Sequence, residues 1–336
     1  MSGTLLHVAL GGTISMQPRD GLLVPALGAA DLAAVLDPPV TPVDVAAVGG
    51  PQLDFPTLVR AHSVIRRGAA DGATGAIVTL GTDAIEEVSA FFAFSGPWPL
   101  NVVITGAMQP GVGPGSDGLL NLGHAAAVAR GQRLSEPVVV FAGRMMLART
   151  ALKVSGTELD AFASPTEPTL RVADVIAADG AGTGAGVWDG PPPPVPGAPG
   201  EHTLEVPILT SALSIGAAGA EPPLPDALPA LVCASSGAGN LTPEVARAAT
   251  RALASGTVVA IATRAFDHRM APGYGYPGGS GVLADAGAIL AAGLSAHKLR
   301  MFLLVALSRG LQGAELRRTL TAFLAATAAE LTPSAL

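Results

Sequence analysis

The sequence predicts an α/β protein with a larger N-terminal domain, built on a doubly wound and mostly parallel sheet, and a smaller C-terminal α/β domain. The chain has 336 residues, which exceeds the ~250–300 residues at which one hydrophobic core usually stops growing. Hydrophobic residues make up 49% of the chain and charged residues 13%. This composition supports a large core and excludes global disorder.

Short apolar segments recur along the chain, and most are ended by glycine or a polar turn. They are continuous rather than alternating, so we expect strands that are buried on both faces. The segments interpreted as strands are 5–10, 76–80, 101–104, 137–141, 231–234 and 258–263.

Helical patterns follow several of these strands. Segment 84–94 places Ile85, Val88, Phe91 and Phe92 on one face, and segments 119–129 and 242–253 follow the same pattern. Strands that alternate with helices indicate βαβ units and therefore a mostly parallel sheet.

A proline- and glycine-rich stretch at 190–200 marks the domain boundary. It contains four consecutive prolines at 191–194, which cannot lie inside a helix or a central strand. We expect a catalytic domain at 1–189, a stiff linker at 190–203 and a C-terminal domain at 204–336. A second proline-rich patch, 221–229, is predicted to be a loop.

Charge and cysteine content exclude several classes of protein. The formal net charge is -7 with only 19 Lys and Arg, which argues against a nucleic-acid partner. The single cysteine, Cys233, lies in an apolar run and is predicted to be a buried structural thiol. We see neither a signal peptide nor the ~18–20 apolar residues of a membrane span, so we expect a cytoplasmic protein without a membrane partner.

The histidines are scattered along the chain, without a His-x-x-x-His pair or a Cys/His cluster. No metal and no cofactor are therefore expected, and each histidine is predicted to have a surface or capping role. The six are His7, His62, His124, His202, His268 and His297.

Small polar residues follow three of the predicted strands. These turns are Gly11-Gly12-Thr13, Gly81-Thr82-Asp83 and 105–108. In open α/β sheets, ligands bind beyond the carboxyl ends of the strands, so the three turns would meet in one crevice if their strands are neighbours. Taken singly, each motif has a simpler structural interpretation as a tight turn or a helix cap, and Lys153 alone is most simply a solvated charge.

Six groups of residues, taken together, change this interpretation. They are Gly11–Ile14; Gly81–Glu87; Thr105–Met108 with Ser116–Gly118 and Asn121-Leu122; Lys153 ahead of Leu159–Phe162; Gly237–Asn240; and Lys298 with Arg300. In this order they resemble the bacterial-type L-asparaginase family, which also includes glutaminase-asparaginases. The resemblance covers nearly the whole chain.

The resemblance implies catalytic roles. Thr13 would be the nucleophile that attacks the side-chain amide carbon, and a threonine hydroxyl needs a nearby base or proton path for this. Thr82, Asp83 and Lys153 would form a second set, in which a neutral Lys153 takes a proton from Thr82 or from water. Backbone N–H groups at the two threonine turns would hold the oxyanion. Asp83 would also bind the substrate ammonium group.

The resemblance also implies substrate-binding residues and an assembly. The binding residues would be Gly12, Gly50, Pro51, Gln52, Gly81, Ala107, Asn240 and Ser280. Asn240 would come from a neighbouring chain, with Ser280 beside it at the usual position of an acidic contact. A homo-oligomer is therefore expected, at least an intimate dimer and usually a tetramer of two such dimers.

Two departures from the family pattern concern activation and affinity. The loop 15–25 lacks the tyrosine that helps to activate the nucleophile, and Leu22 or Leu23 stands in its place. Leucine neither donates nor accepts a proton, so Thr13 is activated through water and the Lys153 set, or the enzyme is slow. Gly50 replaces the usual serine that binds the substrate carboxylate, and Pro51 has no N–H.

Several functions remain open on the sequence. The first is an L-asparaginase with glutaminase as a side activity. A second is a related ω-amide hydrolase, or an ammonia-donating subunit of an aminoacyl-tRNA amidotransferase. A third is a non-catalytic amino-acid-binding homologue, which only the missing tyrosine supports. A nucleotide-binding protein is disfavoured because neither G-x-G-x-x-G nor a P-loop opens the first helix.

Overall fold

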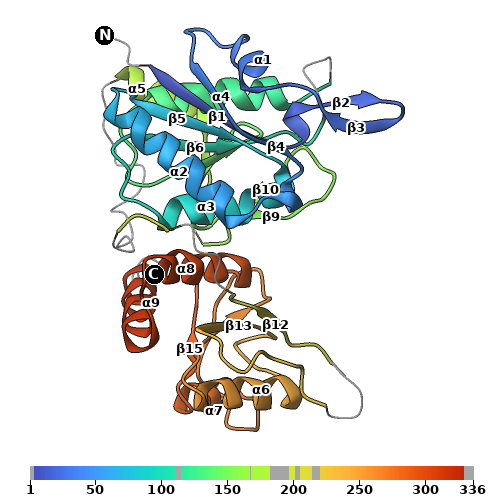
Figure 1. Cartoon of the computed structure of the whole chain (residues 1–336), viewed down its shortest axis with the longest axis vertical. Helices are drawn as coiled ribbons and strands as arrows, with labels where there is room; N and C mark the ends of the chain where they lie inside the picture. The colour runs from blue at the N-terminus through green and yellow to red at the C-terminus, as the bar shows by residue number, and fades with distance from the viewer. Residues whose placement is uncertain are drawn as a thin grey trace. The chain divides into compact units, whose positions relative to one another are not determined.

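The computed structural model describes residues 4–110, 115–166, 168–181, 197–200, 205–213 and 220–328. The chain forms two compact units, unit 1 with residues 1–191 and unit 2 with residues 192–336 (Figure 1). Most of the predicted linker 190–203 lies outside the described residues, so its boundaries and stiffness stay predictions. The patch 221–229 is described and contains no helix or strand, as predicted.

Unit 1 contains a seven-stranded sheet with the order β11-β8-β7-β6-β5-β1-β4. The strands from β4 to β7 in this order are parallel, whereas β8 runs antiparallel to both of its neighbours. The bounds are β1 (Leu5–Gly11), β4 (Thr41–Val48), β5 (Gly75–Thr79), β6 (Asn101–Thr105), β7 (Val138–Phe141), β8 (Arg144–Leu147) and β11 (Leu170–Arg171).

Helices cover both faces of this sheet (Figure 1). On one face α1 (Ala29–Ala33), α4 (Gly118–Arg130) and α5 (Val172–Ala181) pack against side chains of the central strands. On the other face lie α2 (Phe55–Ala70) and α3 (Ile85–Phe94). Every residue of β1, β5, β6 and β7 is buried, which explains why these strands are continuous apolar runs. The predicted doubly wound domain is confirmed.

Unit 2 is smaller and has a four-stranded parallel sheet, β12-β13-β14-β15. Its strands are β12 (Ile208–Thr210), β13 (Ala230–Ser235), β14 (Val258–Thr263) and β15 (Ile289–Leu290). Helices α6 (Pro243–Ala254) and α7 (Ser280–Asp285) lie on one side, and α8 (Ala296–Ser308) and α9 (Gly313–Ala328) lie on the other (Figure 1). Cys233 lies in β13 and is fully buried in the core that the sheet forms with α6, as predicted.

The segment 15–25 is a β-hairpin rather than an irregular loop. Strands β2 (Met16–Arg19) and β3 (Leu22–Pro25) pair antiparallel across Asp20 and Gly21, whose φ angles are 53° and 78°. A two-residue turn with both φ angles positive is the type I′ turn that Asp-Gly favours. The Asp-Gly pair is therefore the sequence signal that identifies this hairpin.

The predicted surface or capping role is wrong for three histidines. His7, His62 and His268 are buried. His7 lies within β1, where Nδ1 donates to the Ala29 carbonyl at 3.2 Å and Nε2 accepts from the Thr79 hydroxyl at 2.9 Å. Polar partners satisfy this ring inside the core, so an apolar run accommodates it. His202 lies outside the described residues.

Within the described ranges, no helix is both long and apolar enough to cross a membrane. The same residues contain no group of three or more His, Cys, Asp or Glu side chains arranged to hold a metal ion.

Candidate active site

The first glycine–threonine turn follows β1. Gly11 and Gly12 have φ angles of 93° and 85°, and Thr13 begins the 3-10 turn η1 (Thr13–Ser15). A Cβ atom added at Gly12 would lie 2.0 Å from the backbone nitrogen of Gly81. Only glycine combines this backbone conformation with such a close approach. Gly12 thus brings the end of β1 into contact with the turn after β5.

The second glycine–threonine turn follows β5 and opens α3. Thr82 begins the 3-10 turn η3 (Thr82–Ala84), which continues directly into the helix. A Cβ atom added at Gly81 would lie 2.8 Å from the backbone nitrogen of Gly50, which begins the turn η2 (Gly50–Gln52) after β4. The turns after β4, β1 and β5 therefore meet at the carboxyl ends of neighbouring strands. The sequence predicts this meeting for the turns after β1 and β5, and the turn after β4 is an addition from the structure.

The turn after β6 joins the same group. A Cβ atom added at Gly106 would lie 2.5 Å from the Leu80 carbonyl oxygen. Asp117 accepts from the backbone nitrogens of Met108 and Gln109 at 3.1 and 2.8 Å. Asn121 donates to the Gly106 carbonyl at 3.1 Å. Asp117 and Asn121 therefore hold the turn that contains Ala107, which is a structural reason for these motif residues.

Lys153 reaches the second threonine turn from β9 (Leu152–Lys153). Its Nζ donates to Thr82 Oγ1 at 2.9 Å and to Asp83 Oδ1 at 2.6 Å. Thr82 is buried, the Lys153 side chain is 18% exposed, and the Asp83 side chain is 66% exposed. The structure thus brings together a buried hydroxyl, a half-buried amine and an exposed carboxylate.

This arrangement is suited to proton transfer and to binding a charged substrate. The amine is within hydrogen-bond reach of the hydroxyl, which is the geometry that proton transfer between them requires. Asp83 uses Oδ1 for Lys153, so its second oxygen and its exposure suit it to accept from a charged donor in solution. The first backbone N–H groups of η1 and η3 have no partner within their own turns, and such groups are typical oxyanion donors.

The loop after β4 holds the third part of the predicted site. Gly50 is buried, whereas Pro51 and Gln52 are exposed. The side-chain oxygen of Gln52 accepts from the Gly49 backbone nitrogen at 3.0 Å. A Cβ atom at Gly50 would lie 3.2 Å from the Ala84 nitrogen, so a larger residue here would require its neighbours to shift by a few tenths of an ångström. The Gln52 amide nitrogen can therefore donate a hydrogen bond to a substrate.

Asn240 and Ser280 are neighbours within unit 2, whereas the residues above belong to unit 1. The side-chain oxygen of Asn240 accepts from the Ser280 backbone nitrogen at 3.1 Å. Ser280 is fully buried and its hydroxyl donates to the Ala271 carbonyl at 2.7 Å. The structure therefore confirms that these two residues lie together and leaves their part in substrate binding a prediction.

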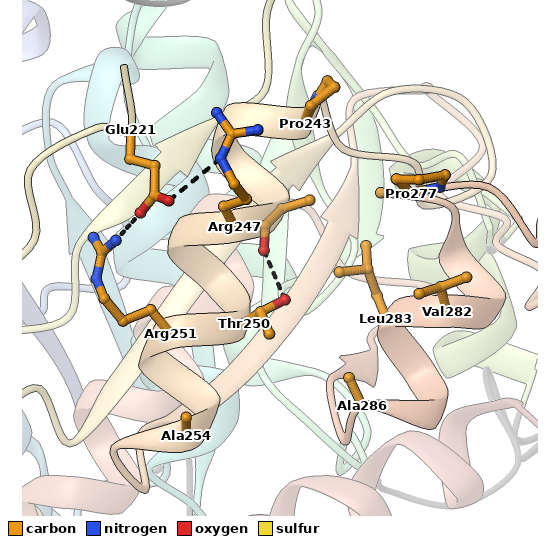
Figure 2. A pocket seen from close by; sticks show the side chains of 12 residues that line it. Glu221, Pro243, Arg247, Thr250, Arg251, Ala254, Pro277, Val282, Leu283 and Ala286 are labelled. Carbon is orange, nitrogen blue, oxygen red and sulfur yellow. Dashed lines mark hydrogen bonds and ion pairs between the residues drawn. The ribbon is translucent and has the colours of Figure 1, made fainter. Parts of the chain in front are cut away.

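Unit 2 also has a largely apolar pocket of about 660 Å³ between α6 and α7 (Figure 2). Arg247 and Arg251 line one wall, and both are ion-paired with Glu221. Pro277, Val282 and Leu283 form the other side. None of the predicted site residues line this pocket, so it is separate from the Thr82–Asp83–Lys153 set.

The fold and the site define a class: a two-domain α/β protein with a hydroxyl–amine–carboxylate set at the carboxyl ends of its parallel sheet. Residues 4–179 match the sequence profile of the family described as "Asparaginase, N-terminal". Residues 205–320 match the profile of the "Glutaminase/Asparaginase C-terminal domain". The chain belongs to this asparaginase family.

Individual proteins that are similar to this chain support the family assignment. A protein of Deinococcus radiodurans named "Probable L-asparaginase" is 36% identical over 254 residues, which cover 75% of this chain and 76% of that protein. The glutaminase-asparaginase of Pseudomonas aeruginosa is 30% identical over 114 residues, 33% of this chain and 32% of the relative. The solved probable cytoplasmic L-asparaginase of Campylobacter jejuni has a TM-score of 0.76 at 21% identity, covering 96% of this chain and 99% of that chain. This last likeness supports the shared fold.

Proposed function

We propose that the protein is an L-asparaginase-type amidohydrolase that converts L-asparagine to L-aspartate and ammonia. The observation that carries the proposal is the contact of Lys153 with Thr82 and Asp83, at 2.9 and 2.6 Å. This set lies beside the turn of Thr13 through the contact of Gly12 with Gly81. Membership of the asparaginase family supplies the reaction class.

In the proposed reaction, Thr13 Oγ attacks the side-chain amide carbon of the substrate. The hydroxyl proton passes through water to the Thr82–Lys153 pair, and the backbone N–H groups of η1 and η3 hold the oxyanion. The C–N bond then breaks, and the nitrogen takes a proton and leaves as ammonia. Water hydrolyses the resulting aspartyl ester, which releases aspartate and restores the Thr13 hydroxyl.

The proposed substrate contacts follow from charge. Asp83 has a free oxygen and an exposed side chain, so it can pair with the substrate ammonium group. Gly12, Gly50, Gly81 and Ala107 offer backbone groups, and the Gln52 amide offers a donor for the α-carboxylate. Asn240 would complete the site from a second copy of the chain, with the backbone of the buried Ser280 holding its side-chain oxygen, so the proposed active form is a homo-oligomer, a dimer or a tetramer.

The proposed route lacks a tyrosine next to Thr13. The β2–β3 hairpin presents Leu22 and Leu23, which are 72% and 47% exposed, in that region of the sequence. Activation of Thr13 through water and the Lys153 set is therefore part of the proposal. The main alternative is a related ω-amide hydrolase, with glutamine as the first substrate to compare because Gly50 and Pro51 change the carboxylate-binding loop.

The test is ammonia release from L-asparagine and from L-glutamine by the wild type and by Thr13→Ala. We expect release from asparagine by the wild type and a loss of at least ~10³-fold in the variant, because the nucleophile is removed. Equal turnover by the two proteins would contradict Thr13 as nucleophile. A folded wild type that releases no ammonia from either amide would favour another ω-amide or a binding protein.

A further inference from the structure

The segment that carries Lys153 has little regular secondary structure of its own. It runs from the end of β8 at Leu147 to β9, a two-residue strand paired with β10 (Phe162–Ala163). A catalytic side chain needs its position fixed to within about 0.5 Å. Backbone pairing of this length is a weak constraint, so other contacts must position Lys153.

Ser89 supplies one such contact from α3. Its side chain is fully buried, and its hydroxyl donates to the Ala148 carbonyl at 3.0 Å. The same oxygen lies 3.1 Å from the carbonyl of Glu86 within the helix. Because α3 continues directly from Thr82 and Asp83, this hydrogen bond ties the body that carries the hydroxyl and carboxylate to the segment that carries the amine.

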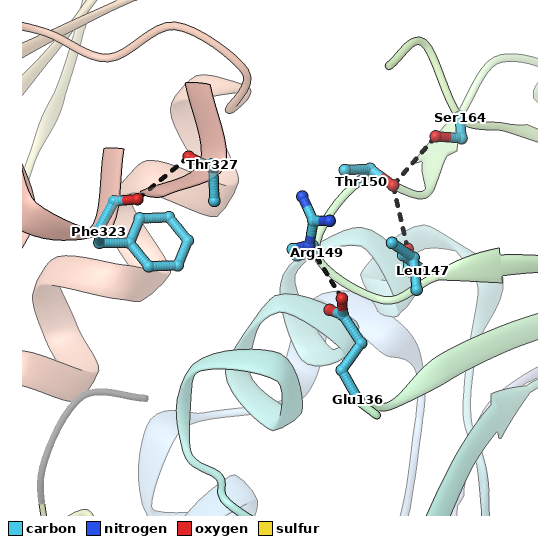
Figure 3. Close-up of polar contacts among 7 residues, drawn as sticks. All are labelled: Glu136, Leu147, Arg149, Thr150, Ser164, Phe323 and Thr327. Atoms are coloured by element: carbon cyan, nitrogen blue, oxygen red, sulfur yellow. Dashed lines mark hydrogen bonds and ion pairs between the residues drawn. The ribbon is translucent and has the colours of Figure 1, made fainter. Parts of the chain in front are cut away.

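Arg149 is the second anchor, next to Ala148 in the chain. Its Nε pairs with Glu136 Oε1 at 3.0 Å, and the two side chains are only 6% and 4% exposed (Figure 3). Desolvation offsets most of the Coulomb energy of such a buried pair. Its hydrogen-bond geometry is nevertheless strict, because a displaced partner would be a buried charge without its counter-charge.

Thr150 is the third anchor. The Ser164 hydroxyl donates to Thr150 Oγ1 at 3.0 Å, and Thr150 Oγ1 lies 3.4 Å from the Leu147 carbonyl oxygen (Figure 3). Ser164 directly follows β10. Three successive residues, Ala148, Arg149 and Thr150, are thus each held by a side chain from a different part of unit 1.

We infer that Ser89 is a positioning residue that sets the Lys153 amine against Thr82, with Glu136–Arg149 and Ser164–Thr150 as the supporting contacts. The inference rests on the proposed function, in which Lys153 moves the proton. Ser89 acts through the backbone of Ala148 and touches no reacting group. Its loss lets the lysine segment shift relative to α3 without altering any substrate contact.

The experiment measures kcat and KM for L-asparagine, with the thermal midpoint, for Ser89→Ala in the full chain. We expect kcat to fall by about tenfold or more, because small misplacements of catalytic groups are costly, and KM to stay within about twofold. The matched control is Thr327→Val in α9. Thr327 is also buried and its hydroxyl donates to the Phe323 carbonyl at 3.2 Å (Figure 3), so this variant also loses a buried helix hydroxyl, in unit 2 rather than in unit 1.

Turnover by the wild type and by Lys153→Met separates the proposed function from the positioning role of Ser89. If the folded wild type releases no ammonia from L-asparagine, the proposed function fails; if Lys153→Met keeps full turnover, the proton-transfer role of Lys153 fails and the role of Ser89 fails with it. If Lys153→Met is inactive while Ser89→Ala and Thr327→Val have the same kcat, only the positioning role is overturned. Should Ser89→Ala not fold, Ser164→Ala decides in its place: a lowered kcat at unchanged KM supports the inference, and an unchanged kcat overturns it.

Discussion

The two glycine–threonine turns of unit 1 are alike in sequence and different in their surroundings. Thr82 is buried, is held by Lys153, and continues into α3, in which eight of the ten residues are buried. Thr13 is half-buried, and its turn continues into the β2–β3 hairpin, whose residues are mostly exposed. One hydroxyl is therefore oriented before substrate arrives, while the other stays accessible. This division suits a proton-transfer pair and a nucleophile.

Removing Lys153, the partner of Thr82, should erase the difference between the two threonines and have the largest effect on kcat. Lys153→Met is expected to lower kcat by roughly 10²–10⁴-fold, the usual contribution of general acid–base catalysis. The thermal midpoint should change little, because the Asp83 carboxylate is 66% exposed and exposed ion pairs contribute ~0–1 kcal/mol.

The matched control for this variant is Arg144→Met. It breaks the exposed Arg144–Asp160 ion pair, whose atoms lie 2.7 Å apart, and should leave kcat unchanged. A large loss of stability in Lys153→Met, with activity per folded molecule preserved, would make the lysine structural instead.

Forcing the two turns apart should have the next largest effect. In Gly12→Ala, the new Cβ would lie 2.0 Å from the Gly81 nitrogen at a φ of 85°. We expect a loss of about 2–5 kcal/mol in the free energy of unfolding, from backbone strain and overpacking together, with a lower kcat.

Gly72→Ala isolates the strain from the clash. Gly72 has a φ of 96°, and an added Cβ meets no atom within 4 Å, so about 1–2 kcal/mol is expected from the left-handed backbone alone. Urea denaturation of both variants gives the difference. Equal losses would mean that the two turns do not depend on their contact.

We expect a smaller effect of pH on stability, which arises in β1 and β5, the two strands that precede the two turns. His7 in β1 bonds Thr79 in β5, and burial lowers the pKa of His7 below its usual 6.5, although the Ala29 carbonyl and Asp44 oppose this shift. Below about pH 6.5 His7 binds a proton in the unfolded chain but stays neutral in the folded chain. Stability should therefore fall as pH falls through this range.

Replacing the imidazole tests this dependence. The thermal midpoint of His7→Gln should decline less steeply than that of the wild type between about pH 7.5 and about pH 5.5. His297, which is exposed, provides the control His297→Gln, expected to keep the slope of the wild type. Identical slopes for His7→Gln and wild type would remove His7 as a source of acid sensitivity.

The sequence predicts the buried parallel strands well because their apolar runs have a single explanation. It does not predict β4, whose residues are partly or fully exposed at the edge of the sheet, so its sequence is not continuously apolar. The contact of Lys153 with Thr82 spans 71 positions, and no spacing rule predicts it; family resemblance points to it instead. The partner of Ser89 and the buried place of His7 depend on packing that only the folded chain reveals.

The burial of Cys233 has a practical consequence for spectroscopy. It is the one cysteine of the sequence, and burial raises the pKa of its thiol to about 12. Alkylating dyes attack the exposed thiolate, so the wild-type chain is nearly inert to them. A cysteine placed by Leu22→Cys, at a position that is 72% exposed on β3, would accept a single fluorophore. That label would report on the hairpin beside Thr13 during turnover, without any need to remove the native cysteine first.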